Sequence, residues 1–366
     1  MEVKVAIKGA PFDILRELGK GAFATVYKAK MRETGKVVAV KVVDLSKFGA
    51  RKGQALREVE IMKGCQHRNL VHLLDIYENK DVEGLQHLLI MIMEFCDGGD
   101  LETLMKTSGK KGLPEEQVRS FMRDLASGLL YLYQKKIVHR DLKPMNLLLK
   151  RVEGRLQLKI ADFGFAKSLA EMGEAINTLL GSPLYMAPEI WKRAPYTNKA
   201  DLWSVGAIMF HMVTGRPPYP VYNRNQLEVV VTTTDLEWPV DLASRCSPAA
   251  EALLRTLLEK DVAKRCDWPT FFQHPFLGLN LEEERVLAPP LAGPGISKVM
   301  GTGTLAPKLR PSDSGDESGL SLDSFVPVPR PEDPAAEAAL HRAAAKEIEA
   351  DLARTSGSSG AAASVS

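Results

Sequence analysis

The chain reads HRDLKPMN over residues 139–146 and IADFG over residues 160–164. The first stretch places a carboxylate (Asp141), an ammonium group (Lys143) and an amide (Asn146) in one short loop. Asp141 can orient an attacking hydroxyl and accept its proton, and Lys143 can stabilise a transferring phosphoryl group electrostatically. Asn146 offers an oxygen ligand to Mg²⁺, a hard cation that prefers oxygen. The loop therefore predicts a metal-assisted transfer site.

A second carboxylate, Asp162, follows a short apolar run and would reach nucleotide phosphates through Mg²⁺. The phosphate cradle is predicted earlier, in the segment GKGAFATV of residues 19–26, because glycines let a hairpin backbone approach phosphates closely. An ordinary glycine turn explains this segment equally well when it is taken alone, and Ala24 stands where a third glycine is usual. The residues assigned to the nucleotide here are Gly19, Lys20, Gly21 and Ala22.

Lys41 ends a run of apolar strand residues, and a buried lysine is costly without a counter-charge. ATP phosphates would supply one counter-charge, and Glu58 on a predicted helix would supply another. Glu60 competes as the partner, but Val59 should face the core and favours Glu58. A solvated lysine at a strand edge is the alternative. All these motifs occur in one order at compatible spacings, which makes a chance assembly very improbable.

The pattern of apolar segments predicts an α+β fold with two lobes. Residues 12–95 carry Val- and Ile-rich runs that indicate a small antiparallel sheet with one helix around residues 54–64. A hinge is expected at residues 94–99. Helical patterns dominate residues 100–276, which would form the larger lobe, and residues 1–11 would be an extension.

Composition and cysteine spacing argue against several classes of protein. The 366 residues are 45% hydrophobic and carry a net charge of +2, which argues against a nucleic-acid binder. The four cysteines lack a C-x-x-C spacing and are expected to be reduced thiols of a cytoplasmic protein. Residues 1–10 lack the apolar core of a secretory signal, and the apolar run at residues 88–93 is too short for a transmembrane segment.

Residues 277–366 are rich in Pro, Gly, Ser and Ala, so we expect them to be largely disordered. Within them, residues 334–354 repeat apolar side chains every four residues and predict a short amphipathic helix. A helix of that length is marginal alone in water and would need a partner.

Residues 12–276 resemble a eukaryotic protein kinase domain from end to end, with APE at residues 187–189 and DLWSVG at residues 201–206 as further marks. The resemblance implies ATP and Mg²⁺ as cofactors, with Asn146 and Asp162 as metal ligands, and protein substrates. It also implies a buried pair between Glu189 and Arg265.

The adenine pocket is implied in the same way. Met93 would be the gatekeeper at the back of the pocket, while the backbone of Glu94 and Cys96 would bind adenine. Asp100 would meet the ribose. Further residues assigned to the nucleotide are Val26, Ala39 and Leu148.

Substrate class and regulation are also implied by resemblance. Lys143 beside Asp141 resembles the serine/threonine-specific branch, and Ser182 matches the hydroxyl that braces both residues. Arg140 and Lys167 resemble the basic pocket that binds an activation-loop phosphate, with Thr178 as the acceptor. An unmodified, solvated threonine is the alternative for Thr178.

A narrower resemblance, to the autophagy-initiating serine/threonine kinases, rests on MEFCDGGDL at residues 93–101 and TLLGSPLYMAPE at residues 178–189. In the tail, Phe325 and Val328 are similar to the short motif that binds the ubiquitin-like modifier of autophagosomal membranes. A chance match is the alternative. If the narrower resemblance holds, the protein would be recruited to pre-autophagosomal membranes and would bind regulatory subunits of autophagy.

That family usually carries a helical C-terminal domain for partners, whereas this sequence ends at Ser366, so either this member lacks the domain or the chain is truncated. Two other functions stay open: a serine/threonine kinase of another pathway, and a kinase-like scaffold without catalytic activity. The scaffold is disfavoured by the intact catalytic residues Lys41, Asp141, Asn146 and Asp162.

Overall fold

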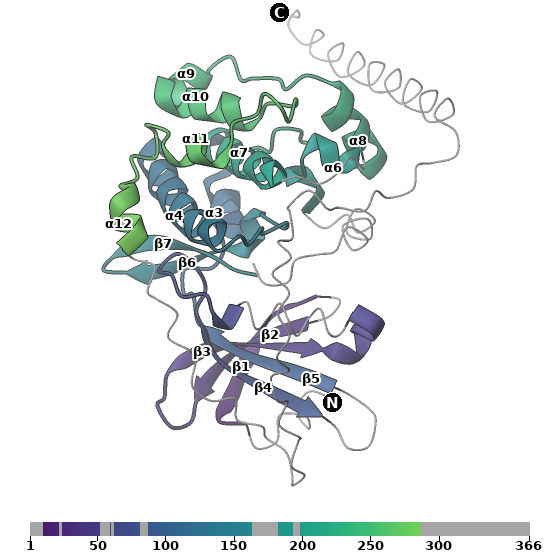
Figure 1. The fold of residues 1–366 in the computed structure, drawn as a ribbon, viewed down its shortest axis with the longest axis vertical. Helices are drawn as coiled ribbons and strands as arrows, with labels where there is room; N and C mark the ends of the chain where they lie inside the picture. The colour runs from purple at the N-terminus through teal and green to yellow at the C-terminus, as the bar shows by residue number, and fades with distance from the viewer. Residues whose placement is uncertain are drawn as a thin grey trace, which may run out of the picture. The chain divides into compact units, whose positions relative to one another are not determined.

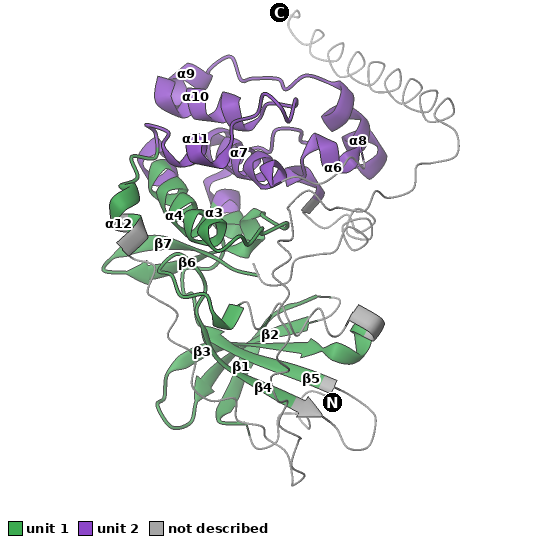
Figure 2. Cartoon of the chain, in the orientation of Figure 1, with its two compact units in different colours: residues 1–104, 119–166, 277–319 green, residues 105–118, 167–276, 320–366 purple. Residues whose placement is uncertain are grey.

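The computed structural model divides the chain into two compact units (Figure 2). Unit 1 comprises residues 1–104, 119–166 and 277–319, and unit 2 comprises residues 105–118, 167–276 and 320–366. Within these bounds the structure describes residues 10–21, 24–51, 59, 62–80, 87–162, 182–192 and 198–286.

A five-stranded antiparallel sheet forms one part of unit 1 (Figure 1). Its strands are β1 (Phe12–Lys20), β2 (Ala24–Met31), β3 (Val37–Asp44), β4 (Leu73–Lys80) and β5 (His87–Glu94). Their spatial order is β1-β2-β3-β5-β4. The predicted antiparallel sheet is therefore present, and the Val- and Ile-rich runs that suggested it form its central strands, as β-branched residues favour.

Strand β3 separates the core of the sheet from the side that carries the candidate site. Val38, Val40 and Val42 belong to one buried apolar cluster, whereas Ala39 belongs to another. Alternate residues of a strand point to opposite faces. Lys41 therefore shares its face with Ala39, and its Cα partners are Val26 on β2 and Met91 on β5.

Unit 1 also contains a two-stranded hairpin, β6 (Leu147–Val152) and β7 (Arg155–Ile160). Its turn residues, Glu153 and Gly154, both have positive φ (49° and 80°), as a tight type I′ hairpin requires. Leu147 lies opposite Ile160, so the residues just before β6 and just after β7 meet at one end of the hairpin.

Several helices accompany these strands. Short 3₁₀ helices are η1 (Leu45–Arg51) and η3 (Pro144–Asn146), and α12 (Leu281–Val286) belongs to unit 1. Helices α3 (Leu101–Ser108) and α4 (Glu115–Gln134) contribute residues to both units. The predicted helix at residues 54–64 is described only at Val59, Met62 and Lys63, which are helical, and at Gly64, which is a turn.

Unit 2 is built around α7 (Lys199–Thr214), which is buried along almost its whole length. A helix that is apolar on all sides must be enclosed by protein. Gly206 permits a close approach, since a Cβ there would lie 2.7 Å from the Leu257 Cβ. The other elements are η2 (Gly109–Lys111), η4 (Ser182–Tyr185), α6 (Pro188–Trp191), α8 (Arg224–Thr233), α9 (Leu242–Arg245), α10 (Pro248–Leu257) and α11 (Trp268–Phe272).

The structure thus confirms the α+β class, and α4 and α7 occupy stretches predicted to be helical. It differs at the start of the tail, where α12 forms within residues assigned to the disordered segment; the rest of the tail, including residues 334–354, lies outside the described residues. All four cysteines are free thiols, and three of them are buried. Among the described helices, none is both long and apolar enough to cross a bilayer.

Candidate active site

The candidate site begins with an ion pair between two predicted residues, Lys41 on β3 and Asp162 just after β7. Lys41 Nζ lies 2.5 Å from Asp162 Oδ1, and the lysine side chain is almost fully buried. Burial by itself would raise the pKa of Asp162, but the charge and hydrogen bond of Lys41, together with the charge of Lys143, hold it below its usual range. Asp162 is therefore an anion at neutral pH.

The loop of Asp141 is closed by its own polar side chains. Lys143 Nζ donates to Asp141 Oδ2 at 2.9 Å. The Asn146 amide nitrogen donates to the Asp141 carbonyl at 2.8 Å and to Asp141 Oδ2 at 3.1 Å. Because the nitrogen is committed in this way, the Asn146 oxygen is the atom that can face a metal. The structure thus brings together three of the predicted catalytic residues.

Two contacts join this loop to Asp162. The N–H of Ala161 donates to the carbonyl of Asn146 at 2.8 Å. His139 is almost completely buried; its Nε2 lies 3.0 Å from the Ala161 carbonyl, while its Nδ1 accepts from the N–H of Asp141 at 3.2 Å. This pattern fits a neutral ring protonated on Nε2. His139 thus links the two acidic residues, a role that was not predicted from the sequence.

Two residues of the site have a strained backbone. Arg140 has φ 63° and Asp162 has φ 58°, in the left-handed region that most side chains avoid. Such residues persist where surrounding contacts hold them, and they cluster at functional sites. The oxygen donors of Asn146 and Asp162 are of the type that Mg²⁺ prefers, so the residues present fit this ion.

The residues assigned to adenine share one apolar cluster. Val26, Ala39, Met93, Cys96 and Leu148 all belong to it. Its other members, which were not predicted from the sequence, are Val71, Leu73, Phe95 and Ala161. Burial raises the pKa of the Cys96 thiol to about 12, with the Glu94 charge adding to the effect, so this thiol is protonated and unreactive.

The glycine hairpin between β1 and β2 has room above it. Among the residues that the structure describes, a Cβ placed on Gly19 would meet no atom within 4 Å, and one on Gly21 would meet only the Ala24 carbonyl at 3.6 Å. The N–H of Gly21 donates to that carbonyl at 2.8 Å and closes the turn. No positive φ forces a glycine at either position. The absence of side chains here leaves space in which a ligand could approach the backbone closely. Lys20, at the end of β1, is exposed.

Glu94 has a side-chain role that was not predicted from the sequence. Its buried carboxylate pairs with Lys159 Nζ on β7 at 2.7 Å and with Lys150 Nζ on β6 at 2.5 Å, and it accepts the N–H of His72 at 2.9 Å. Burial acts to raise the pKa of Glu94, but the two lysines lower it overall. The predicted hinge is therefore fixed to the hairpin that ends just before Asp162.

Asp100, the predicted ribose contact, caps a helix. It accepts the N–H of Thr103 at 2.8 Å and the Thr103 hydroxyl at 3.1 Å, at the start of α3. This capping holds one carboxylate oxygen on each donor. A ribose contact would have to be made with this capping in place.

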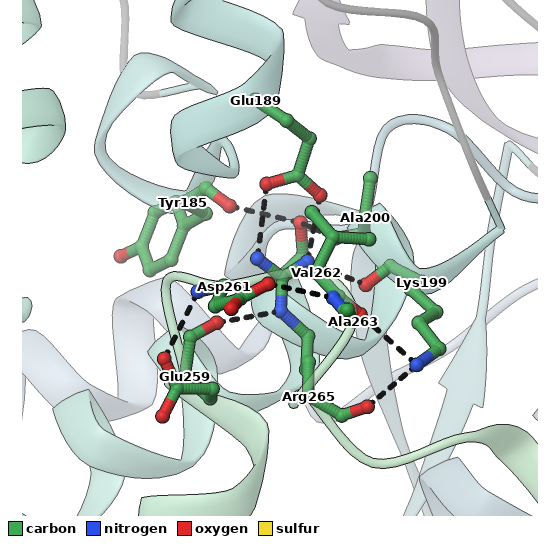
Figure 3. Close-up of polar contacts among 10 residues, drawn as sticks. Tyr185, Glu189, Lys199, Ala200, Glu259, Asp261, Val262, Ala263 and Arg265 are labelled. Atoms are coloured by element: carbon green, nitrogen blue, oxygen red, sulfur yellow. Dashed lines mark hydrogen bonds and ion pairs between the residues drawn. The ribbon is translucent and has the colours of Figure 1, made fainter.

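The implied pair between Glu189 and Arg265 is confirmed in unit 2. The two guanidinium nitrogens donate to the two carboxylate oxygens at 2.6 and 2.9 Å, and both side chains are buried (Figure 3). Arg265 also donates to the carbonyls of Glu259 and Lys199, both at 2.9 Å. Such bidentate geometry is the strong form of a carboxylate–arginine contact.

Several assigned residues lie outside the described residues: Ala22, Glu58, Lys167, Thr178, Phe325 and Val328. Ser182 is described only by its backbone, which begins η4. Their roles remain predictions.

Comparison with known proteins shows the family to which the chain belongs. Residues 12–277 match the protein kinase domain family. The chain is 40% identical over 309 residues to serine/threonine-protein kinase ATG1a of Arabidopsis thaliana, covering 84% of this chain and 47% of that protein.

Two further relatives match most of this chain. It is 36% identical over 326 residues to serine/threonine-protein kinase ULK3 of Rattus norvegicus, covering 87% of this chain and 64% of that protein. It is 34% identical over 301 residues to serine/threonine-protein kinase 36 of Pongo abelii, covering 82% of this chain and 21% of that protein. The chain spans about half the length of ATG1a and less than a quarter of kinase 36. Because the family match covers residues 12–277, the chain belongs to the protein kinase domain family.

Proposed function

We propose that this chain is an ATP-dependent kinase that transfers the γ-phosphate of ATP to serine and threonine hydroxyls of proteins. The observation that carries this proposal is the connected arrangement of Asp141, Lys143 and Asn146 with the Lys41–Asp162 pair. The apolar cluster around Ala39 and Met93 would hold the adenine ring.

Each side chain has a step to perform. Asp141 would orient the substrate hydroxyl and accept its proton, while Lys143 would stabilise charge on the transferring group. Lys41 would bind phosphate oxygens. Asn146 and Asp162 would hold Mg²⁺, which neutralises charge on the phosphates. Asp162 supports this role because its pKa is low and its carboxylate is ionised.

Specificity for serine and threonine is supported by Lys143, two residues after Asp141, and by the names of the relatives. The test is a set of peptides that differ only at the acceptor: Ser, Thr, Tyr or Ala. Labelling of the first two is expected. Equal labelling of the tyrosine peptide would contradict the assigned class, and an Asp141→Asn variant controls for contaminating kinases.

The pathway we propose is the initiation of autophagy. Similarity to ATG1a and to atg1 of Dictyostelium discoideum, at 40% and 41% identity, supports it. Phe325 and Val328 would then bind the ubiquitin-like modifier and bring the kinase from the cytoplasm to pre-autophagosomal membranes. Regulatory subunits of autophagy are further candidate partners.

A pulldown of the full chain with the purified modifier tests this placement. Phe325→Ala should abolish binding, and Val326→Ala, which changes a residue between Phe325 and Val328, should not. Unchanged binding by Phe325→Ala would contradict the proposed role of Phe325 and Val328 in binding the modifier. A second candidate is a serine/threonine kinase of another pathway, which the similarity to kinase 36 over 82% of this chain favours.

A further inference from the structure

A buried carboxylate lies far along the chain from the candidate site. Glu284 lies in α12, the helix labelled in Figure 1, and its exposed fraction is only 8%. Its Oε1 lies 2.6 Å from Nη2 of Arg68, and its Oε2 accepts the hydroxyl of Ser127 on α4 at 2.5 Å. His67 Nε2 is 3.7 Å from the same Oε2. A buried carboxylate is costly without such partners, so these contacts fix α12 in place.

The chain that leads into α12 is held as well. Arg123 on α4 donates to the carbonyl of Gly278 at 2.8 Å, where φ is 55°. The side-chain oxygen of Asn280 accepts the N–H of Glu282 at 3.2 Å, and the carbonyl of Asn280 accepts the N–H of Glu284 at 3.1 Å. These contacts start the helix and aim Glu284 at its partners.

The loop that receives Glu284 is also fixed to α4. The ring of His67 stacks on that of Tyr131, with centroids 5.3 Å apart, and its Nδ1 accepts the N–H of Asn69 at 3.1 Å. The hydroxyl of Tyr131 accepts the N–H of Gln66 at 3.1 Å. Burial lowers the pKa of His67 to about 4 although Glu284 opposes the shift, so the ring is neutral and can donate only from Nε2.

The same loop pairs with β7 directly before Asp162. The Asn69 amide donates to the carbonyl of Leu158 at 2.9 Å. The N–H of Ile160 donates to the carbonyl of Asn69 at 2.8 Å, and the N–H of Val71 donates to the carbonyl of Ile160 at 2.9 Å. Movement of the loop would therefore displace the end of β7 that carries Asp162.

We propose that Glu284 is a positioning residue for the phosphoryl-transfer site: by holding residues 66–71 against β7, it holds Asp162 where it can bind a metal–nucleotide complex. This rests on the function proposed above. Residues just past the family match would then contribute to nucleotide binding, although none of them touches the nucleotide.

The test compares Glu284→Gln with Glu282→Gln, an exposed glutamate on the same helix. The full chain is used, at a temperature where circular dichroism shows both variants folded. Calorimetry with Mg²⁺ and a non-hydrolysable ATP analogue should show roughly tenfold weaker binding for Glu284→Gln and no change for Glu282→Gln. Hydrogen exchange should rise in Glu284→Gln at residues 67–71 and 158–162.

A variant that unfolds at lower temperature but binds the analogue with unchanged affinity would overturn the proposal, because Glu284 would then only stabilise the fold. Should Glu284→Gln fail to fold, Arg68→Gln replaces it, since half of that side chain is exposed. Arg68→Gln should weaken binding in the same direction, and unchanged affinity would overturn the proposal. Because the readout is binding, it stays informative even if the wild type transfers no phosphate, which would count against the proposed function alone.

Discussion

Lys41 Nζ and Asp162 Oδ1 lie 2.5 Å apart, although 121 positions separate the two residues in the chain. The pair joins the five-stranded sheet to the end of β7, both within unit 1. Each side chain provides the opposite charge that offsets the cost of removing its partner from water. The chemistry expected of both residues toward phosphate and metal therefore starts from an arrangement that the apoprotein already holds.

The contact between Glu94 and Lys159 should contribute to stability. Lys159→Met would leave the buried carboxylate with the Lys150 ammonium and the N–H of His72. We therefore expect a loss of about 2 kcal/mol, below the roughly 3–5 kcal/mol typical of a fully broken buried pair. Lys150 is the matched control: its side chain is 34% exposed, so Lys150→Met should cost less. Denaturant unfolding of the two single variants and of the double variant measures these free energies. Equal losses in Lys159→Met and Lys150→Met would contradict the prediction.

Arg265 should be among the most sensitive positions of unit 2. Arg265→Met would leave Glu189 charged and buried, and we expect a loss of about 3–5 kcal/mol. Thermal unfolding measures it. The control is Arg255→Met. The Arg255 side chain is half exposed and pairs with Glu251 on the same helix. We expect this variant to lose at most about 0.5 kcal/mol. Comparable losses in the two variants would refute the importance of the buried pair.

His67 should make stability depend on pH. Its pKa is lowered from the usual 6.5 to about 4 by burial, with Arg68 and Lys159 acting in the same direction and Glu284 against it. The unfolded chain therefore takes up a proton below pH 6.5 that the folded protein resists until about pH 4. The free energy of unfolding should fall as pH drops through this window, by up to about 1.4 kcal/mol per pH unit.

Denaturant unfolding at about pH 7, 6 and 5 for the wild type and His67→Gln isolates this effect. The difference between the two proteins should shrink toward low pH. A difference that stays constant over the window would mean that His67 titrates normally in the folded protein.

Thr178 remains a predicted phosphorylation site. Thr178→Ala should lower phosphate transfer, because a phosphate bound by Arg140 and Lys167 would order the segment around it. Activity on a generic protein substrate measures this, and Ser168→Ala, which removes another hydroxyl from the same stretch of sequence, is the matched control. Full activity in Thr178→Ala would rule out the proposed switch.

The sequence was sufficient for the residues whose chemistry is carried by local motifs. Asp141, Lys143 and Asn146 lie within six positions, so their spacing already implied the loop that the structure shows. The apolar partners of Met93 were also predictable in part, because the kinase resemblance pointed to Val26, Ala39 and Leu148.

Contacts between distant polar residues were not predictable. Glu94 and Lys159 are 65 positions apart, and neither local spacing nor apolar periodicity encodes their pairing. Glu284 follows a Gly-containing stretch near the start of a tail whose composition predicts disorder. Its short helix is stabilised by partners at residues 67, 68 and 127, which one-dimensional patterns do not bring together.

The most direct test of the account is transfer of labelled γ-phosphate to a generic protein substrate in the presence of Mg²⁺, comparing the wild type with Asp162→Ala. The wild type should label the substrate, and the variant should lose roughly a hundredfold or more of that activity. Circular dichroism of both proteins excludes unfolding as the cause. Equal labelling by the folded variant would contradict the assignment of Asp162, and with it the metal-dependent site built around Lys41.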